Sequence, residues 1–248
     1  MEPSDSKALL SALSQTPFAR AAVDPDLVPA IYLYCDQWCM YCPATARCLA
    51  YRCIPAAATP PDPADLLPNI ADRMYESLAL VKALTTAEGR AVPALDHLLA
   101  NDPRKVDALP RVDDPLERMA RRYAVASSRY LMSRPDFPFR MEPHADGPTA
   151  FEVFAWYHTL IAAKVYRALV GRAAAVRGDA AAANDALGCA KTALIGVERS
   201  RTALQTLAAN DDDARLDDMA AQLRRLAREL EARFPDARMF VRPGLDAR

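Results

Sequence analysis

The sequence predicts an all-α protein, a helical bundle with a small N-terminal cysteine-rich metal-binding module. Only 7 of the 248 residues are glycine, and the hydrophobic fraction of 52% is rich in alanine. Strand-rich folds need glycine turns and β-branched runs, which this composition does not favour. Apolar residues recur at helical spacing in the C-terminal half, and five of the six cysteines fall within residues 35–53. These observations separate a cysteine segment from a helical remainder.

Proline marks the predicted domain boundaries. Residues 1–54 are expected to hold one or two short helices and the cysteine module. Residues 55–67 belong to the proline-rich stretch IPAAATPPDPADLLP, which cannot form a regular element and is interpreted as a stiff linker. Residues 68–248 are expected to form the bundle. We place its helices at about 68–87, 93–99, 115–133, 148–176, 181–208 and 212–233.

Local signals place the ends of these helices. Asp114 precedes Pro115, and Glu117 follows in the first turn, which is a typical helix N-terminus. Gly178 and Asp179 provide the turn between the two longest predicted helices.

The last predicted helix carries an apolar seam. Its members alternate in steps of three and four: Leu216, Met219, Leu223, Leu226 and Leu230. This pattern predicts a helix packed lengthwise on its neighbours in a bundle core. The alternative is a protein partner or homo-oligomer that binds through the Leu216–Leu230 helix.

The cysteine segment is where the residue types point to chemistry. Its spacing is Cys35-x3-Cys39-x2-Cys42-x5-Cys48. Thiolates bind soft or borderline metals, and short spacings present several sulfurs to one centre. Pro43 stops a helix from continuing through this stretch, so the backbone is free to curl back. We therefore predict that these four cysteines hold a metal ion or cluster.

The nearly contiguous spacing slightly favours an iron–sulfur cluster, and zinc is the alternative. The Cys-x3-Cys-x2-Cys part resembles the motif of radical S-adenosylmethionine enzymes, but the strands of their barrel are not predicted. WCMYC resembles a thioredoxin-type site, but no βαβ pattern follows it. Buried cysteines that act as small hydrophobes are the structural alternative, with Cys53 and Cys189 as the candidates.

The net charge and the hydropathy of the chain limit the classes of partner that it is expected to bind. The formal net charge is -1 and the pI is near 6.3, so no basic surplus indicates binding to nucleic acid or to an anionic membrane. The N-terminal stretch lacks the pattern of a signal peptide, and the most apolar stretch, 151–170, carries Glu152, His158, Lys164 and Arg167. We expect a cytoplasmic protein, in which thiols stay reduced.

Three segments resemble a family of uncharacterised bacterial helical proteins. They are IYLYCDQWCMYCPATARC (31–48), AWYHTLIAAKVYRAL (155–169) and CAKTALIGVERS (189–200). The resemblance implies a helical fold and carries no activity. It draws attention to Lys164, Arg167, Lys191, Glu198 and Arg199. This chain has Cys189 and Glu198 where the family pattern has a small residue and Asp.

Polar side chains interrupt the apolar faces of two predicted helices. Lys164 follows Tyr157 and Ile161 on one face, and Lys191 and Glu198 lie on an apolar line of the next helix. Such residues rarely enter an apolar stripe unless paired. We predict a buried network of Lys164, Lys191 and Glu198 that either sets the helix register or lines a small-molecule pocket. His158 is a further candidate for that pocket, although we expect a core histidine with a hydrogen-bond partner.

A carboxylate-bridged diiron bundle is disfavoured. Such bundles need Glu-x-x-His on two helices, but Ala155 follows Glu152 and Arg201 follows Glu198 at that spacing.

Three functions remain open. The first is a metal-binding protein with a redox, metal or assembly role. The second is an enzyme with a polar pocket inside the bundle, formed by Lys164, Lys191 and Glu198 with His158 as a further candidate, in which the zinc or cluster is structural and the catalytic residues are not identified. The third is a structural module in which zinc replaces a core.

Overall fold

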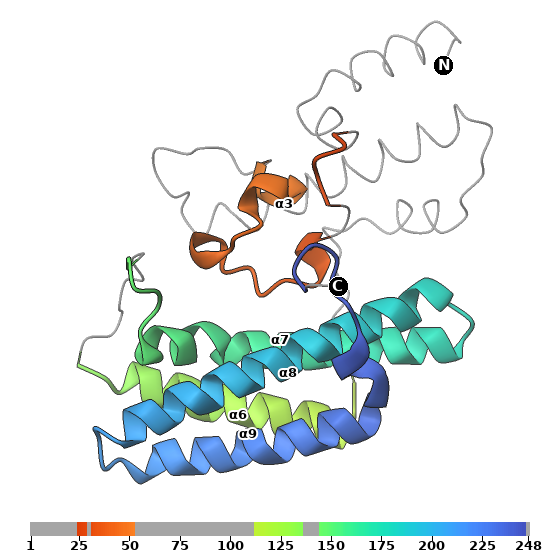
Figure 1. Ribbon diagram of the computed structural model, residues 1–248. Helices are drawn as coiled ribbons and strands as arrows, with labels where there is room; N and C mark the ends of the chain where they lie inside the picture. Colours follow the sequence, from red (N-terminus) through yellow and green to blue (C-terminus); the bar gives the residue numbers. More distant parts are fainter. Residues whose placement is uncertain (1–23, 29–30, 53–111, 136–143, 247–248) are drawn as a thin grey trace, which may run out of the picture. The chain divides into compact units, whose positions relative to one another are not determined.

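The computed structural model describes residues 24–28, 31–52, 112–135 and 144–246 (Figure 1). All regular elements in these ranges are helical, and no strand occurs within them. The predicted all-α class is therefore confirmed for the described part of the chain. The predicted linker 55–67, the helices at 68–87 and 93–99, and Cys53 lie outside the described residues.

The chain divides into two compact units. One comprises residues 28–48 and 112–248, and the other comprises residues 1–27 and 49–111. The described part of the second unit contains one short helix, α3 (Leu49–Arg52). The first unit contains the bundle together with the four clustered cysteines. The domain boundaries at residues 54 and 67 stay a prediction.

Four long helices form the bundle, and their ends lie within about two residues of the predicted ones. They are α6 (Pro115–Met132), α7 (Ala150–Val176), α8 (Ala180–Ala208) and α9 (Ala214–Arg233). Each is preceded by a residue whose side chain accepts a hydrogen bond from a first-turn backbone N–H: Asp114, Thr149, Asp179 and Asp213. These caps satisfy N–H groups that have no partner inside the helix.

The four helices run up, down, up and down. Short turns connect α7 to α8 and α8 to α9, which makes these pairs antiparallel (Figure 1). Arg233 at the end of α9 pairs with Asp114 at the start of α6 at 2.6 Å. At the other end, Arg134 pairs with Asp211 at 3.1 Å. These two ion pairs place α6 antiparallel to α9 and close the bundle.

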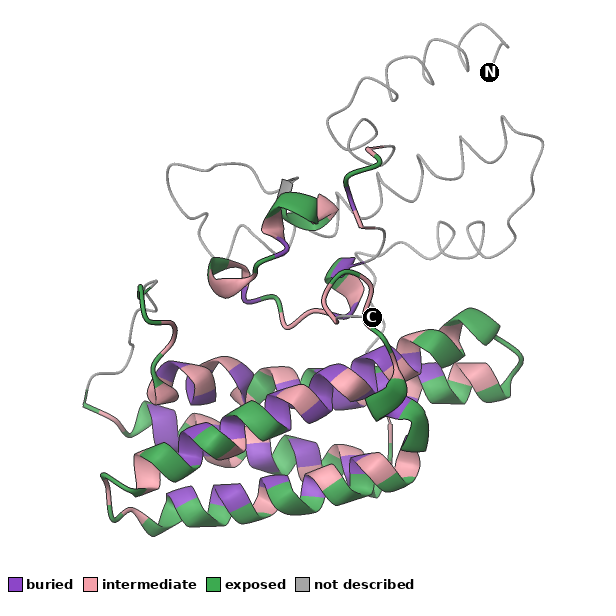
Figure 2. Cartoon of the chain, in the orientation of Figure 1, coloured by how far each residue is buried: buried purple, intermediate pink, exposed green. Residues whose placement is uncertain are grey.

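The core lies along the inner faces of the four helices, whose outer faces are exposed (Figure 2). The predicted seam of α9 is buried there along its whole length: Leu216, Met219, Leu223, Leu226 and Leu230. The interpretation as a bundle core is therefore confirmed. A partner for α9, which stays a prediction, would have to use the opposite face of this helix.

Glycine lets α7 and α8 approach closely. A Cβ atom on Gly196 of α8 would lie 2.9 Å from the ring of Tyr157 and 3.0 Å from the side chain of Ile161 on α7. Since these neighbours are buried ring and branched side chains, a larger residue would force the helices apart.

The segment that carries the cysteines consists of three short 3₁₀ turns, η1 (Ile31–Leu33), η2 (Cys39–Tyr41) and η3 (Thr45–Arg47). We call residues 31–48 the cysteine loop. A fourth turn, η4 (Pro235–Met239), follows α9 and packs on α8 and α9. Among the described helices, none combines the length and the apolar character needed to span a bilayer.

Candidate functional site

Asp36 anchors the cysteine loop to the bundle. Its carboxylate accepts hydrogen bonds from the hydroxyl of Tyr157 on α7 and, at 3.0 Å, from Nη1 of Arg199 on α8. Its backbone carbonyl accepts from the indole N–H of Trp156 at 2.9 Å. Burial raises the pKa of Tyr157, and the charge of Asp36 adds to that effect, so the hydroxyl remains a donor at neutral pH. One loop residue is thereby bound by three residues of two helices.

Two more contacts hold the backbone just before Cys35. Nζ of Lys164 donates to the carbonyl of Leu33 at 3.1 Å, and the hydroxyl of Thr192 donates to the carbonyl of Tyr34 at 2.9 Å. The Lys164 side chain is buried, and this burial lowers its pKa. Because these hydrogen bonds are made to backbone carbonyls, they hold the main chain of the loop in position rather than its side chains.

Aromatic side chains of the cysteine loop also pack against the bundle. The ring of Trp38 is 4% exposed and stacks on that of Trp156, with centroids 5.1 Å apart and planes at 8°. The ring of Tyr34 lies against Gly188 of α8, where a Cβ atom would come within 2.2 Å of it. Glycine is therefore required at position 188, because any side chain there would overlap the Tyr34 ring.

Gln37 lies between the two anchors Asp36 and Trp38 and has a φ of 59°. Residues other than glycine seldom adopt this left-handed conformation, which costs about 1–2 kcal/mol. Such a conformation persists only where the surroundings determine it. The bonds of Asp36 on one side and the stacking of Trp38 on the other supply that constraint.

The four clustered cysteines are free and half-buried: Cys35, Cys39, Cys42 and Cys48. Burial raises the pKa of Cys35 and of Cys39. For Cys39, the charges of Cys35, Cys42 and Cys48 raise the pKa further.

The cysteines are not yet arranged as a closed metal site. Within the described ranges, no three His, Cys, Asp or Glu side chains are placed so that they could hold a metal ion. The predicted ligand set therefore stays a prediction. Cys189 on α8 is fully buried in the core, as expected for a structural cysteine.

Lys191 and Glu198 bind the C-terminal segment. Lys191 donates to the backbone carbonyls of Arg238 and Phe240, at 3.1 and 2.7 Å, and pairs with Asp246 at 3.2 Å. Glu198 pairs with Arg238 at 2.7 Å. Because Lys164 binds the cysteine loop instead, no hydrogen bond between described residues joins these three side chains into the predicted network.

His158 on α7 contacts the backbone of its own helix. Its Nδ1 is within hydrogen-bond distance of the carbonyl of Ala155, and its partial burial lowers its pKa. The contact is with a carbonyl one turn earlier in the same helix, so the role of His158 stays a prediction.

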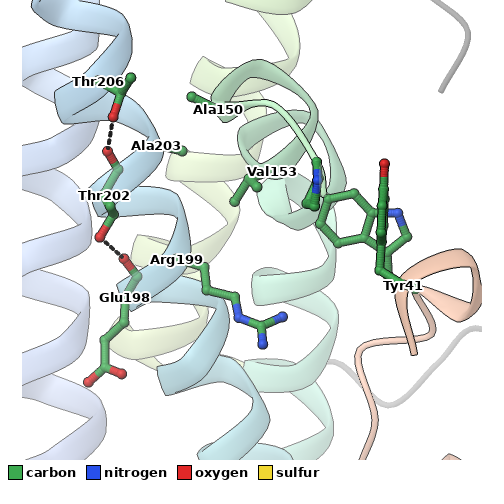
Figure 3. A pocket seen from close by; sticks show the side chains of 10 residues that line it. Tyr41, Ala150, Val153, Glu198, Arg199, Thr202, Ala203 and Thr206 are labelled. Atoms are coloured by element: carbon green, nitrogen blue, oxygen red, sulfur yellow. Dashed lines mark hydrogen bonds between the residues drawn. The ribbon is translucent and has the colours of Figure 1, made fainter. Parts of the chain in front are cut away.

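Two adjoining cavities lie beside the cysteine loop. The larger, which we call the bundle cavity, has a volume of about 570 Å³ and lies between α7, α8 and the loop (Figure 3). It is lined by Trp38, Tyr41, Pro148, Ala150, Val153, Glu198, Arg199, Thr202, Ala203 and Thr206. The smaller, the loop cavity, has about 160 Å³ and is lined by Cys35, Asp36, Trp38, Tyr41, Cys42, Pro43, Arg199, Arg242 and Leu245. Trp38, Tyr41 and Arg199 line both.

The sequence motifs indicated only part of this site. Asp36, Trp156 and Tyr157 belong to the segments that resemble the helical family, but no role could be attached to them from spacing alone. Arg199 was indicated by the same resemblance. No known family model, curated protein or solved structure matches the chain.

Proposed function

We propose that the cysteine loop binds an iron–sulfur cluster or a zinc ion through Cys35, Cys39, Cys42 and Cys48, and that the centre has a redox, metal or assembly role. One observation carries the proposal: four free, half-buried thiols lie within fourteen residues on a loop that the bundle holds in place. A loop kept only for packing would not need to gather four thiols at its half-exposed surface.

The chemistry of the donors and of their surroundings supports the proposal. Thiolates are the preferred ligands of zinc and of iron–sulfur clusters. Arg199 and Arg242 line the loop cavity together with Cys35 and Cys42. The nearby Lys164 lowers the pKa of Cys35, against the larger opposite effect of burial. Cations around the loop would balance the negative charge of several thiolates.

Binding requires the sulfurs to converge further than they do in the described arrangement. Cys39 and Cys42 lie at the start and just past the end of η2, which is closed by backbone bonds of 3.1 and 3.2 Å. Rotation of the Cys39 and Cys42 side chains between staggered rotamers moves their sulfurs without changing the turn, and the anchored backbone before Cys35 serves as the fixed reference. An iron–sulfur cluster would supply one-electron transfer, and a zinc ion would stiffen the loop.

Metal analysis of the anaerobically purified protein tests the proposal. We expect bound iron and sulfide with absorption near roughly 400 nm, or one bound zinc without colour. Cys39→Ser should reduce the metal content by at least about half, because one of four ligands is lost. Cys189→Ser is the matched control and should retain it, since Cys189 lies in the core. The proposal would be refuted if the protein contained neither an iron–sulfur cluster nor zinc in stoichiometric amount. It would also be refuted if Cys39→Ser and Cys189→Ser lost the same fraction of the metal.

A further inference from the structure

The bundle cavity has the size and the walls of a small-molecule site. Its volume of about 570 Å³ falls within the range of about 300–1,000 Å³ that ligand pockets occupy. Val153 and Ala150 of α7 face Ala203 of α8 across it, and Tyr41 of the cysteine loop borders it (Figure 3). None of the clustered cysteines is among its lining residues.

Arg199 provides a cation at this cavity. Its hydrogen bonds to Asp36 and Tyr157 both use Nη1. The side chain extends from α8 toward the cavity and is 54% exposed (Figure 3). A guanidinium carries five donors in a planar fork, and among the described residues Nε and Nη2 of Arg199 make no hydrogen bond, so they can bind a second, bidentate acceptor.

The neighbouring charges limit the anion that this cation can bind. Glu198 also lines the cavity, but its carboxylate pairs with Arg238 and lies away from the Arg199 guanidinium (Figure 3). Asp36 already compensates part of the Arg199 charge. A single arginine whose charge is already partly compensated by one carboxylate favours a monoanion over a phosphate with two charges.

Trp38, which lines the bundle cavity, has a hydrogen-bond donor without a partner among the described residues. The indole N–H of Trp38 is buried and has no hydrogen-bond partner among the described residues. Buried polar groups are nearly always paired, and each exception calls for an explanation. Trp38 is a lining residue of both cavities, so its side chain belongs to the wall that the two share.

We propose that the bundle cavity binds a small aromatic carboxylic acid. Its ring packs between Tyr41 and the apolar side chains of Val153 and Ala203, and its carboxylate accepts two hydrogen bonds from the outer edge of Arg199. The clustered cysteines do not line the cavity, so this binding is separate from the neighbouring metal centre proposed above, although Trp38, Tyr41 and Arg199 line both cavities.

Isothermal titration calorimetry with three probes tests the proposal. The probes are 2-naphthoate, the neutral 2-naphthylmethanol and the aliphatic octanoate. We expect 2-naphthoate to bind roughly ten- to a hundredfold more tightly than the alcohol, because only the acid can bind the guanidinium as an anion. Octanoate should bind more weakly than 2-naphthoate, since it lacks the flat ring. Equal affinity for acid and alcohol, or for the aromatic and aliphatic acids, would overturn the proposal.

Two cavity variants and one matched control locate the site. Ala203→Leu adds a larger apolar side chain to the cavity wall, one helical turn after Arg199, and should abolish binding of 2-naphthoate. Ala183→Leu makes the same change at an exposed position of α8 and should leave binding unchanged. Arg199→Lys keeps the charge but removes the fork, so affinity should fall at least about fivefold. If Ala203→Leu still bound 2-naphthoate with unchanged affinity, the bundle cavity would not be the binding site.

One further variant separates this site from the metal centre. In Cys39→Ser, 2-naphthoate should bind as in the unmodified protein even where the metal is lost. Binding that disappears together with the metal would show that the cavity is not an independent site, and would overturn the inference while leaving the metal proposal standing.

Discussion

Tyr157→Phe removes the hydroxyl that joins α7 to Asp36 and leaves the buried ring in place. A hydrogen bond to a charged acceptor contributes about 1.5–3 kcal/mol to stability. The Asp36 side chain keeps its bond to Arg199 and is 19% exposed, so water can replace part of the lost contact. We therefore expect the lower end of that range, a loss of about 1.5 kcal/mol in the free energy of unfolding. For a chain of this size, that corresponds to a fall in Tm of about 3–6 °C.

Urea unfolding followed by far-UV circular dichroism measures this loss, and Tyr123→Phe is the matched control. Tyr123 is also fully buried, and its hydroxyl lies beside Ser127 and Ser200 without a hydrogen bond of good geometry. Burial raises the pKa of Tyr123 to about 12, so this hydroxyl stays neutral as well. Removing this buried hydroxyl, which makes no hydrogen bond of good geometry with the described residues, should change stability by no more than about 0.5 kcal/mol, or increase it.

The same pair of variants reports on the cysteine loop. If Asp36 holds the loop, its thiols should react faster with a disulfide reagent in Tyr157→Phe, because the loop opens more often. Their reactivity should be unchanged in Tyr123→Phe. Equal stabilities and equal thiol reactivities in the two variants would refute the role assigned to Asp36.

Two further predictions concern the contacts of α8. Gly188→Ala would place a Cβ atom within 2.2 Å of the Tyr34 ring. We expect the free energy of unfolding, measured by chemical denaturation, to fall by about 1–3 kcal/mol, although alanine has the better helix propensity. The clustered thiols should also be labelled faster. Unchanged stability and unchanged labelling would contradict the close approach of Tyr34 to Gly188. Asp246 is half-buried, which acts to raise its pKa, but hydrogen bonds from Arg242 and the ion pair with Lys191 hold the pKa at about 2. A carboxyl whose pKa is lowered on folding stabilises the protein above about pH 4 and loses this effect as the pH falls toward 2. Asp246→Asn should cost about 2 kcal/mol at pH 7 and flatten the acid side of the stability profile, whereas parallel profiles would rule the contribution out.

The limits of the helices were accessible from the sequence because they depend on local interactions. Each cap residue binds an N–H two or three positions away, as Asp114 binds Leu116 and Thr149 binds Glu152. The α9 seam likewise repeats every three or four residues, so its burial follows from the helical period. Signals of this kind are contained in a few neighbouring residues.

The arrangement of the candidate site was decided by tertiary structure. Asp36 meets Tyr157 and Arg199 across separations of 121 and 163 residues, and Lys191 reaches the carbonyl of Phe240 across 49. Pairings over such distances leave no periodic trace in a single sequence. The bundle cavity exists only because α7, α8 and the cysteine loop meet at one place, and no property of any one segment specifies that meeting. The sequence by itself therefore determined the helices and the cluster of thiols, while packing determined what holds the thiols in place and which space lies beside them.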